Sequence, residues 1–428
     1  MKILMKTVII VLVLITFSQN LSAQAQTLDF TEIDRYIETE MDRSKIPGLA
    51  LGIIQNGDLV YLQGYGQADR NRPVTPETPF VIGSLSKSLT AVLIMQLVEG
   101  GEIDLDDPIT KYLPWFTMAG PYDADNITIR QLLLQSSGIP NSAGLVVMAE
   151  SNTLELETEI RALQNETLSA PPGETFIYSN ANYQILGLVI EVVTGQKYSE
   201  YLQENLLNPL TMQNSYLSLA AGEAASMAKG HVKWFGIPRP TPILYLQNSL
   251  AAGFIISSAE DMCHYLQLHL DLAVDEGETV LSPAGVSALH EPGLFLDEQH
   301  AYAFGLISMA RDETPPFLFH DGAVQGFNSA MAFSPEEQWG VIVLTNISGQ
   351  IELAAGSIAL GVSEFLQGHT PEPGSNLPGI MYISALVLIL ALIILVIRAL
   401  VLLPKKWGRR LAEQRPRGFQ YLSRVLLP

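Results

Sequence analysis

Apolar residues repeat with two different periods near the start of the chain. In Leu28–Ser44 they recur at helical spacing, which predicts an amphipathic helix. Two runs of β-forming residues follow, Leu49–Gln55 and Leu59–Gly64, and the segment Asn56-Gly57-Asp58 between them is a strong hairpin signal. The region therefore begins with a helix and an antiparallel hairpin.

A similar pattern in reverse order closes the region. Ser329–Phe333 and Val341–Thr345 predict antiparallel strands around Pro335-Glu336-Glu337, and Leu353–Leu366 predicts a closing helix. We expect the first and last helices to pack on one face of a sheet built from both chain ends. Residues 105–291 are richer in helical and loop patterns, which predicts a helical lobe with a site in the cleft between the lobes.

A long apolar run follows the closing helix. Pro378–Leu403 is broken only by Ser384 and Arg398, and its length can cross a bilayer of about 30 Å. A buried core helix would show a polar face, which this run lacks. Arg398 can extend its charge to the membrane interface. Because residues 404–428 are rich in lysine and arginine, we expect this basic tail to lie in the cytoplasm.

The first residues of the chain have the pattern of an export signal. Lys2 and Lys6 precede the apolar run Val8–Phe17, and Ala23-Gln24-Ala25 places small residues where a signal peptidase reads them. An uncleaved anchor is the alternative. The expected organisation is a signal at 1–25, a catalytic domain at 26–370, a stiff linker at 371–377, a membrane helix at 378–403 and the tail. This describes a single-pass cell-membrane protein with an extracytoplasmic domain.

Charge is distributed unevenly along the chain. It has 24 basic and 44 acidic side chains, and the part between the signal and Arg398 keeps 14 basic against 43 acidic, a net charge of −29. This excludes nucleic acid as a partner and favours a neutral or locally recognised substrate, because anionic surfaces would repel the domain. Cys263, the only cysteine, cannot form an internal disulfide.

Three short motifs occur in one order: Ser84-Leu85-Ser86-Lys87, Tyr178-Ser179-Asn180 and His320-Asp321-Gly322. A serine hydroxyl is a weak nucleophile, so a serine enzyme needs a neighbouring group that takes its proton. In a helix, three-residue spacing places the lysine amine on the same face as the serine Oγ. The tyrosine and the histidine would add a second proton handler and a wall of the site.

The chain contains a second Ser-x-x-Lys, Ser226-Met227-Ala228-Lys229. Ser84 follows the apolar run Phe80–Gly83 and precedes apolar positions at helical spacing, so it should begin a partly buried helix. Ser226 lies in an alanine-rich stretch without such a pattern, and we interpret it as a surface serine. A single match of this kind is weak, whereas the ordered set of three motifs is not.

With these motifs, the chain resembles the serine β-lactamase and penicillin-binding protein superfamily, on the branch that holds class C β-lactamases, D-aminopeptidases, DD-carboxypeptidases and related esterases. The similarity runs from about Ile46 to about Asn346, and it includes Ile127–Leu133, Ser136-Ser137-Gly138, Pro172-Gly173 and Gly326–Ser329. The resemblance implies an α+β fold, with an antiparallel sheet flanked by helices and a helical lobe. One C-terminal transmembrane helix would follow.

The resemblance also implies roles for matching residues. Ser84 would attack a carbonyl to form an acyl-enzyme, and Lys87 would accept its proton if burial and neighbouring positive charge lower the amine's pKa. Tyr178 would relay a proton to the leaving group. Whether Lys87 or Tyr178 is the general base stays open. Asn180 would hydrogen-bond the acyl-side amide or carbonyl of the substrate.

The third motif would complete the site. The backbone N–H groups of Ser84 and Ala323 would form the oxyanion hole, with Gly322 just before Ala323. Where β-lactamases and many penicillin-binding proteins have Lys-Thr-Gly, this chain has His320, and an imidazole is only partly charged near pH 7. His320 as an ordinary strand histidine is the alternative to a substrate-binding role.

Together with the export signal, the resemblance implies an exported serine hydrolase acting on esters or D-amino-acid-containing peptides. The alternatives are a penicillin-interactive DD-carboxypeptidase or β-lactamase, and a non-catalytic sensor of wall peptides. A sensor would not need Ser84, Lys87 and Tyr178 together. The remaining histidines lack metal-ligand spacing and no phosphate-binding loop is present, so we expect no metal and no cofactor. The expected partners are a small-molecule or peptide substrate and the membrane.

Overall fold

The computed structural model describes residues 28–144, 155–270, 279–310, 315–349, 354–372, 374 and 377–413. Its centre is a nine-stranded antiparallel sheet in the order β3-β2-β1-β13-β12-β11-β10-β9-β8. Strands from the two ends of the domain meet where β1 pairs with β13. The strands are β1 Gly48–Gln55, β2 Asp58–Asp69, β3 Arg72–Pro73, β8 Leu294–Phe295, β9 His300–Tyr302, β10 Ile307–Met309, β11 Phe317–Val324, β12 Phe327–Ser334 and β13 Trp339–Thr345.

The hairpin expected at Asn56-Gly57 is confirmed. Asn56 and Gly57 have φ angles of 52° and 91°, and Gln55 pairs directly with Asp58 across the turn. Two central residues with positive φ match the right-handed twist of paired strands, so this turn sets the first pairs of β1 and β2, and an irregularity between Ile53 and Ile54 then shifts the register. Strand β2 extends five residues past the expected end at Gly64.

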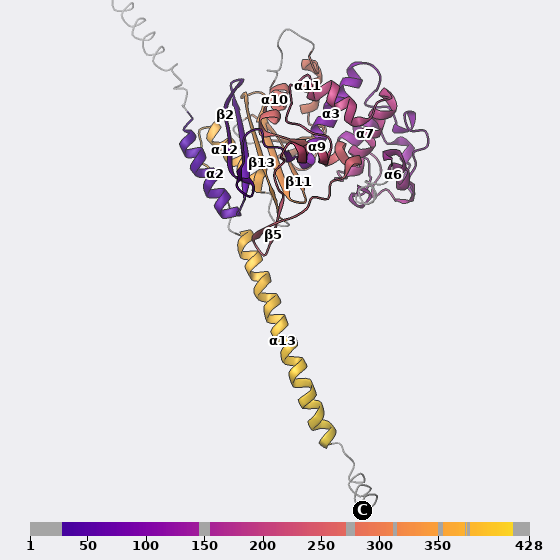
Figure 1. The fold of residues 1–428 in the computed structure, drawn as a ribbon. Helices are drawn as coiled ribbons and strands as arrows, with labels where there is room; N and C mark the ends of the chain where they lie inside the picture. Colours follow the sequence, from indigo (N-terminus) through magenta and orange to yellow (C-terminus); the bar gives the residue numbers. More distant parts are fainter. Residues whose placement is uncertain are drawn as a thin grey trace, which may run out of the picture.

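One face of the sheet is covered by two helices from opposite ends of the domain, as expected. Helices α2 (Phe30–Ser44) and α12 (Ala354–Leu366) lie side by side on it (Figure 1). Helix α2 begins after Asp29, whose side chain accepts a hydrogen bond from the Thr31 N–H. Apolar side chains fill the space between the helices and the sheet, among them Ile33, Ile37, Leu49, Leu51, Ile53, Val341, Val343, Ile358 and Val362.

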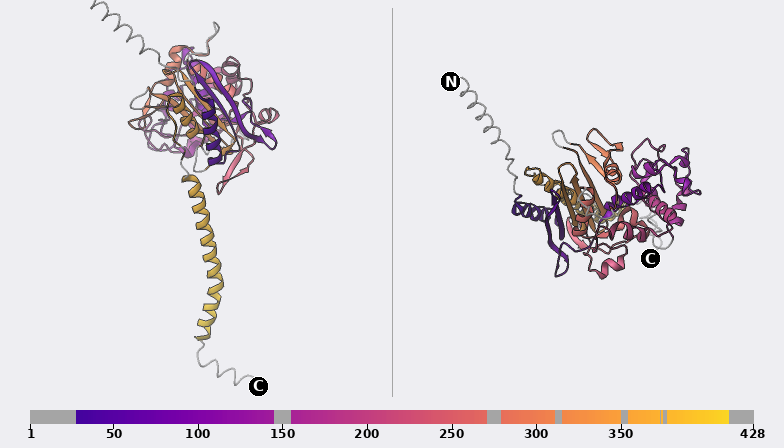
Figure 2. Two further views of the ribbon diagram at one scale, coloured as in Figure 1. Left: turned by 90° about the vertical axis from the view of Figure 1, so that its left-hand side faces the viewer. Right: turned by 90° about the horizontal axis from the view of Figure 1, so that it is seen from above.

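The other face of the sheet carries the helical lobe, which the middle of the chain forms as expected (Figures 1 and 2). A second apolar cluster joins the lobe to the sheet. Three minor pairings, β4 with β7, β14 with β5 and β5 with β6, lie outside the main sheet. The elements are α3 Ser86–Glu99, α4 Ile129–Leu133, α6 Leu156–Ala162, α7 Asn180–Thr194, α8 Tyr198–Leu202, α9 Leu219–Ala224, α10 Ala259–His269, α11 Pro283–His290, β4 Phe80–Val81, β5 His231–Trp234, β6 Ile237–Pro240, β7 Ile256–Ser257 and β14 Ile347–Ser348.

Helix α3 differs from the partly buried helix expected to begin at Ser84. A 3₁₀ turn, Gly83–Leu85, precedes it, and 11 of its 14 residues are buried. Its polar side chains tolerate burial because they find hydrogen-bond partners: the Ser86 hydroxyl donates to the Gly83 carbonyl at 2.8 Å, and the Thr90 hydroxyl donates to the Ala251 carbonyl at 2.8 Å. The residues after Ser84 therefore lie in the centre of the molecule.

A single long helix, α13 (Leu377–Glu413), extends away from the globular part (Figure 1). Within the described residues, its segment Ile380–Leu400 is the one helix long and apolar enough to cross a membrane, and none of that segment is buried. The helix continues past the boundary expected at 403. Before it, the Gly374 N–H donates to Glu40 of α2 at 3.1 Å. The expected signal at 1–25 and residues 414–428 of the tail lie outside the described residues.

Candidate active site

The structure brings Ser84, Lys87 and Tyr178 together. Lys87 Nζ donates a hydrogen bond to Ser84 Oγ at 3.0 Å, and the Tyr178 hydroxyl donates to the same oxygen at 2.7 Å. The three residues come from the 3₁₀ turn before α3, from α3 itself and from the segment that leads into α7. Ser84 is partly exposed, so a substrate can reach its hydroxyl. Two proton-handling groups thus converge on one accessible hydroxyl.

Two close backbone approaches hold Ser84 against strand β11. Gly83 has a φ angle of +55°, and a Cβ atom on it would lie 2.7 Å from the Ala323 nitrogen. A Cβ atom on Gly322 would lie 3.0 Å from the Ser84 nitrogen and would also collide with the Ile82 carbonyl oxygen. The two segments can approach this closely only because both positions are glycine. The backbone amides of Ser84 and Ala323 therefore lie at neighbouring positions, as an oxyanion hole requires.

Lys87 is completely buried, with 0% of its surface exposed. Its Nζ donates to Asn180 Oδ1 at 2.8 Å and to the Ala252 carbonyl at 2.5 Å, in addition to Ser84. Burial lowers the pKa of Lys87 from 10.5 to about 7, while the negative charge of Asp321 opposes this shift. The sequence interpretation invoked neighbouring positive charge as a second cause. The structure corrects this expectation, because the neighbouring charge is that of Asp321, which is negative, and desolvation is the larger effect on the Lys87 pKa.

The surroundings of Tyr178 shift its pKa in the opposite direction, upward. Burial raises the pKa of its phenol well above the usual 10, and the hydrogen bond to Ser84 only partly offsets this. The residue is therefore a neutral phenol near pH 7 and can give a proton more readily than it can take one. Lys87, with a pKa near neutrality, is the better proton acceptor. Both groups lie within hydrogen-bond distance of Ser84 Oγ, so the opposite directions of their pKa shifts, and not the distances, favour Lys87 as the base.

A buried polar network positions the tyrosine motif. The Ser179 N–H donates to Gln135 Oε1 at 2.9 Å, and the Ser137 hydroxyl donates to Asn182 Oδ1 at 2.6 Å. The Asn141 side chain donates to the Tyr178 carbonyl at 2.9 Å. These contacts explain why the stretch around Ser136-Ser137-Gly138 accompanies the tyrosine motif, since it holds the segment that carries Tyr178.

His320 is buried, with 2% of its surface exposed. Its Nδ1 hydrogen-bonds the Asp321 carbonyl at 2.6 Å. Burial and the nearby Lys87 lower the pKa of the imidazole to about 4. The expectation of a partly charged imidazole near pH 7 is therefore wrong, because the His320 ring is neutral at that pH. On β11, residues 320 and 322 share one side of the strand, and Gly322 on that side meets the backbone around Ser84.

Sequence reasoning missed one contributor to the site. The carbonyl of Ala252 accepts a hydrogen bond from Lys87, and the adjoining carbonyl of Ala251 accepts one from Thr90 of α3. Both belong to an apolar stretch of small residues without any polar side chain. A backbone acceptor leaves no signature in residue type, so no sequence signal pointed to it.

The second Ser-x-x-Lys motif lies elsewhere. Ser226 is exposed and follows α9 with a φ angle of +61°, in agreement with the expected surface serine. Asn180, by contrast, lies where the motif predicts, at the start of α7, and its side-chain oxygen orients the Lys87 amine. Its predicted contact with the substrate stays a prediction.

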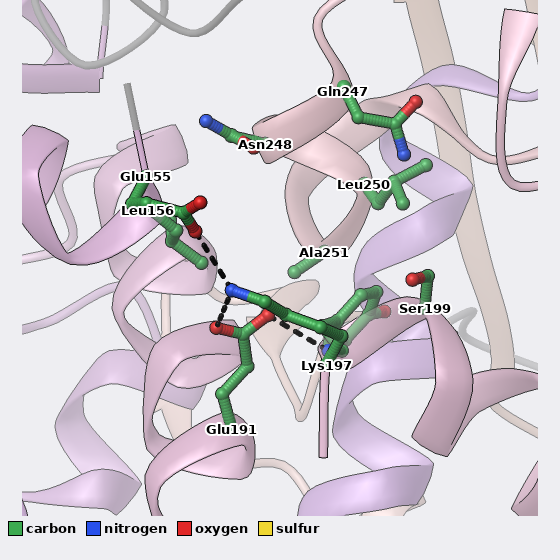
Figure 3. A pocket seen from close by; sticks show the side chains of 10 residues that line it. Glu155, Leu156, Glu191, Lys197, Ser199, Gln247, Asn248, Leu250 and Ala251 are labelled. Carbon is green, nitrogen blue, oxygen red and sulfur yellow. Dashed lines mark hydrogen bonds and ion pairs between the residues drawn. The ribbon is translucent and has the colours of Figure 1, made fainter. Parts of the chain in front are cut away.

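A separate pocket of about 210 Å³ lies in the helical lobe and contains none of the predicted catalytic residues (Figure 3). Lys197 reaches Glu155 at 2.9 Å and Glu191 at 3.6 Å there, and Glu191 also accepts the Tyr198 N–H at 3.0 Å. These contacts tie the start of α6 to α7 and α8. Because the lysine and Glu155 are largely exposed, the pairs contribute little stability. Among the described residues, no group of three or more His, Cys, Asp or Glu side chains could hold a metal ion.

The chain belongs to the beta-lactamase family, whose model matches residues 33–360. It is similar to Protein flp of Staphylococcus aureus (strain N315), with 29% identity over 327 residues, 74% of this chain and 63% of the relative. The match thus spans less than two thirds of that relative's length. The expected family is confirmed, and it is a superfamily of serine hydrolases.

Solved structures agree with the fold. The octameric penicillin-binding protein homologue from Pyrococcus abyssi is 30% identical, has a TM-score of 0.70 and aligns over 80% of this chain and 78% of its own. A class C beta-lactamase has a TM-score of 0.66 at 21% identity, over 78% of this chain and 96% of its own. The latter likeness shows the fold alone, and with it the predicted fold class is confirmed.

Proposed function

We propose that this protein is an exported, membrane-anchored serine hydrolase that forms an acyl-enzyme at Ser84 on esters or D-amino-acid-containing peptides. One observation carries the proposal. The completely buried Lys87 amine, with its pKa lowered to about 7, lies 3.0 Å from Ser84 Oγ. A lysine with an ordinary pKa would be charged and could not accept the serine proton at neutral pH.

Each group at the site would take one role in the reaction. Neutral Lys87 accepts the Ser84 proton as Oγ bonds to the substrate carbonyl carbon, and the amides of Ser84 and Ala323 stabilise the resulting oxyanion. Tyr178 gives its proton to the leaving group and recovers one from the Lys87 ammonium. The acyl-enzyme then reacts with water, which releases the acid and restores Ser84.

The neutral His320 supports the choice of substrate class. A buried imidazole with a pKa of about 4 supplies no cation for a substrate carboxylate near pH 7. The strongly acidic domain further disfavours anionic substrates. Esters and amides without a negative charge beside the scissile bond fit these electrostatics better than penicillins. The membership of the beta-lactamase family keeps a penicillin-interactive carboxypeptidase as the second candidate.

The proposed anchor is the segment Ile380–Leu400 of α13, whose apolar side chains are exposed. A surface of this kind is unfavourable in water and is stabilised by a bilayer. With the basic tail inside the cell, the catalytic domain would face outward. Protease treatment of intact cells tests this, because it should remove the domain and leave the tail protected.

Labelling with two probes tests the activity. The full chain and Ser84→Ala are treated with a fluorophosphonate and, separately, with a fluorescent penicillin. The proposal predicts fluorophosphonate labelling that requires Ser84, together with faster turnover of a p-nitrophenyl ester or a D-alanine amide than of benzylpenicillin. Strong penicillin labelling would favour the second candidate. No label from either probe would favour the non-catalytic sensor.

A further inference from the structure

The hairpin formed by β5 and β6 ends in an apolar tip. Trp234 pairs with Ile237 across a two-residue turn, in which Phe235 and Gly236 have φ angles of 47° and 82°. Two positive φ angles are typical of a tight two-residue hairpin turn. Trp234, Phe235 and Ile237 are 65%, 41% and 55% exposed. Three large apolar side chains within four residues thus face away from the protein.

The hairpin tip lies beside the start of α13 (Figures 1 and 2). A Cβ atom on Gly236 would lie 3.9 Å from the Cβ of Tyr382, whose hydroxyl is buried. Tyr382 is the third residue of the membrane-spanning candidate Ile380–Leu400. A bilayer positioned around that span would therefore meet the hairpin at the level of its interface with water.

We propose that the tip of the β5–β6 hairpin inserts into the headgroup region of the outer leaflet of a phospholipid bilayer. The inference rests on the proposed membrane span and adds a second point of attachment to it. Tryptophan favours the membrane interface, where its ring is apolar and its N–H remains hydrated. Tyr382 belongs to the same layer, next to the hairpin.

Charge on the hairpin fits the same partner. The domain as a whole carries a net charge of −29, yet the hairpin contributes Lys233 and Arg239 and no acidic residue. Basic side chains flanking an aromatic tip can reach lipid phosphates. The hairpin is thus a locally basic part of a domain whose overall negative charge anionic membranes would repel. Together with α13, it would restrict how the domain tilts, and so the direction in which Ser84 faces.

Fluorescence quenching in vesicles tests the proposal. The full chain carrying Trp407→Phe, which removes the tryptophan near the other end of α13, is reconstituted in phosphatidylcholine vesicles with or without bromine on the lipid chains. The remaining tryptophans besides Trp234 are Trp115, which packs under Arg161, and Trp339, which is 3% exposed. We expect brominated lipid to reduce the tryptophan fluorescence of the Trp407→Phe chain by quenching Trp234. In the Trp407→Phe, Trp234→Phe chain, brominated lipid should cause no such reduction.

A matched control uses another exposed aromatic position. Phe295, 74% exposed, belongs to β8 at one edge of the sheet, whereas His231 and Pro240 of the hairpin line a pocket with Gln67 and Asp69 of β2, next to the opposite edge strand β3. Adding Phe295→Trp to the Trp407→Phe, Trp234→Phe chain should give a tryptophan that brominated lipid leaves unquenched. Equal quenching at both positions would overturn the proposal, because the contact would then not be specific to the hairpin.

Flotation of the same vesicles separates this proposal from the anchor on which it rests. A chain that floats with the vesicles and keeps its full Trp234 emission retains the span and refutes the hairpin contact. The hairpin tip would then be a contact surface for a protein partner or for a second copy of this chain. A chain that stays at the bottom of the gradient refutes the span and the hairpin contact together.

Discussion

Lys87 Nζ lies 3.0 Å from Ser84 Oγ, inside a site where the lysine side chain has no exposed surface. The amine is held there by Asn180 and the Ala252 carbonyl, so its position does not depend on a charged partner. Desolvation lowers its pKa and outweighs the opposing negative charge of Asp321. The serine and the lysine thus form a nucleophile and base suited to neutral pH.

The first prediction concerns the pH dependence of acylation. Only the neutral amine can accept the serine proton, so kcat/KM for a p-nitrophenyl ester should rise with pH, with a midpoint at the Lys87 pKa of about 7. It should then level off at higher pH. Initial rates corrected for spontaneous hydrolysis give this profile. A midpoint near 10 would mean that Lys87 keeps an ordinary pKa.

His320→Gln is the control for that assignment, because an unperturbed histidine also titrates near neutrality. The His320 pKa of about 4 leaves the ring neutral throughout the measured range. The variant should therefore keep the midpoint near 7, even if its maximal rate is lower. Loss of the midpoint in this variant would assign the titration to the imidazole.

The second prediction concerns Tyr178→Phe. Removing the hydroxyl takes away the donor 2.7 Å from Ser84 Oγ and the proton relay to the leaving group, while Lys87 remains able to accept the serine proton. For a D-alanine amide, whose amine leaving group must be protonated, we expect kcat to fall by about 10²–10⁴-fold, the range of a lost general acid, with the midpoint of the pH profile still near 7. Steady-state kinetics at several pH values measure both. An unchanged kcat would exclude the tyrosine from the chemistry.

The third prediction concerns the contact between β11 and the turn before α3. In Gly322→Ala the new methyl group would lie 3.0 Å from the Ser84 nitrogen and collide with the Ile82 carbonyl, so the two segments must separate. We expect loss of about 1–3 kcal/mol in the free energy of unfolding and a large loss of activity. Denaturant titration and ester turnover measure these effects.

Gly100→Ala is the matched control for Gly322→Ala. Gly100 has a helical φ of −68°, and its nearest neighbour would lie 3.4 Å from the added Cβ, at ordinary contact distance. This variant should keep full activity and lose no stability. Equal effects of the two substitutions would show that the close approach at Gly322 is unimportant.

The fourth prediction concerns a pair of histidines outside the three motifs. His269 Nδ1 and His290 Nε2 are 2.9 Å apart, and both rings pack against Phe333. Burial lowers the pKa of both, that of His290 to about 4, so below pH 6.5 the unfolded chain binds protons that the folded chain refuses. Stability should therefore decrease as pH falls from 6.5 to 4, by at most about 3 kcal/mol for His290.

His290→Gln removes that titrating group and keeps a hydrogen-bonding side chain. Its free energy of unfolding, from denaturant titrations between pH 4 and pH 8, should depend less on pH than that of the unsubstituted protein. The same slope in both proteins would place the acid sensitivity elsewhere.

Local patterns predicted the framework of the fold. Asn56-Gly57 fixed a turn because both residues accept positive φ, and the helical spacing of apolar residues in Leu28–Ser44 defined the face that meets the sheet. The pattern failed at α3, where Ser86, Lys87 and Thr90 are polar and yet buried. Ser86 has a local acceptor in Gly83, but Lys87 and Thr90 depend on acceptors far along the chain, which no local pattern contains.

The sequence also predicted the residues of the candidate site, but not their charge states. Motif spacing identified Ser84, Lys87 and Tyr178, and the structure brings them together. The charge states of the site were not predictable, because the pKa of a lysine or histidine depends on solvent exclusion by the whole fold. This is why the cause of the Lys87 shift and the neutrality of His320 required the structure.

Intact-mass spectrometry after exposure to a p-nitrophenyl ester tests the central claim most directly. The chain provides its own control, since Ser84 and Ser226 each begin a Ser-x-x-Lys motif but only Ser84 contacts its lysine. The account predicts an acyl adduct on the unsubstituted protein and on Ser226→Ala, and none on Ser84→Ala. An adduct that persists in Ser84→Ala, or neither an adduct nor Ser84-dependent release of p-nitrophenol from the unsubstituted protein, would contradict an acyl-enzyme at Ser84.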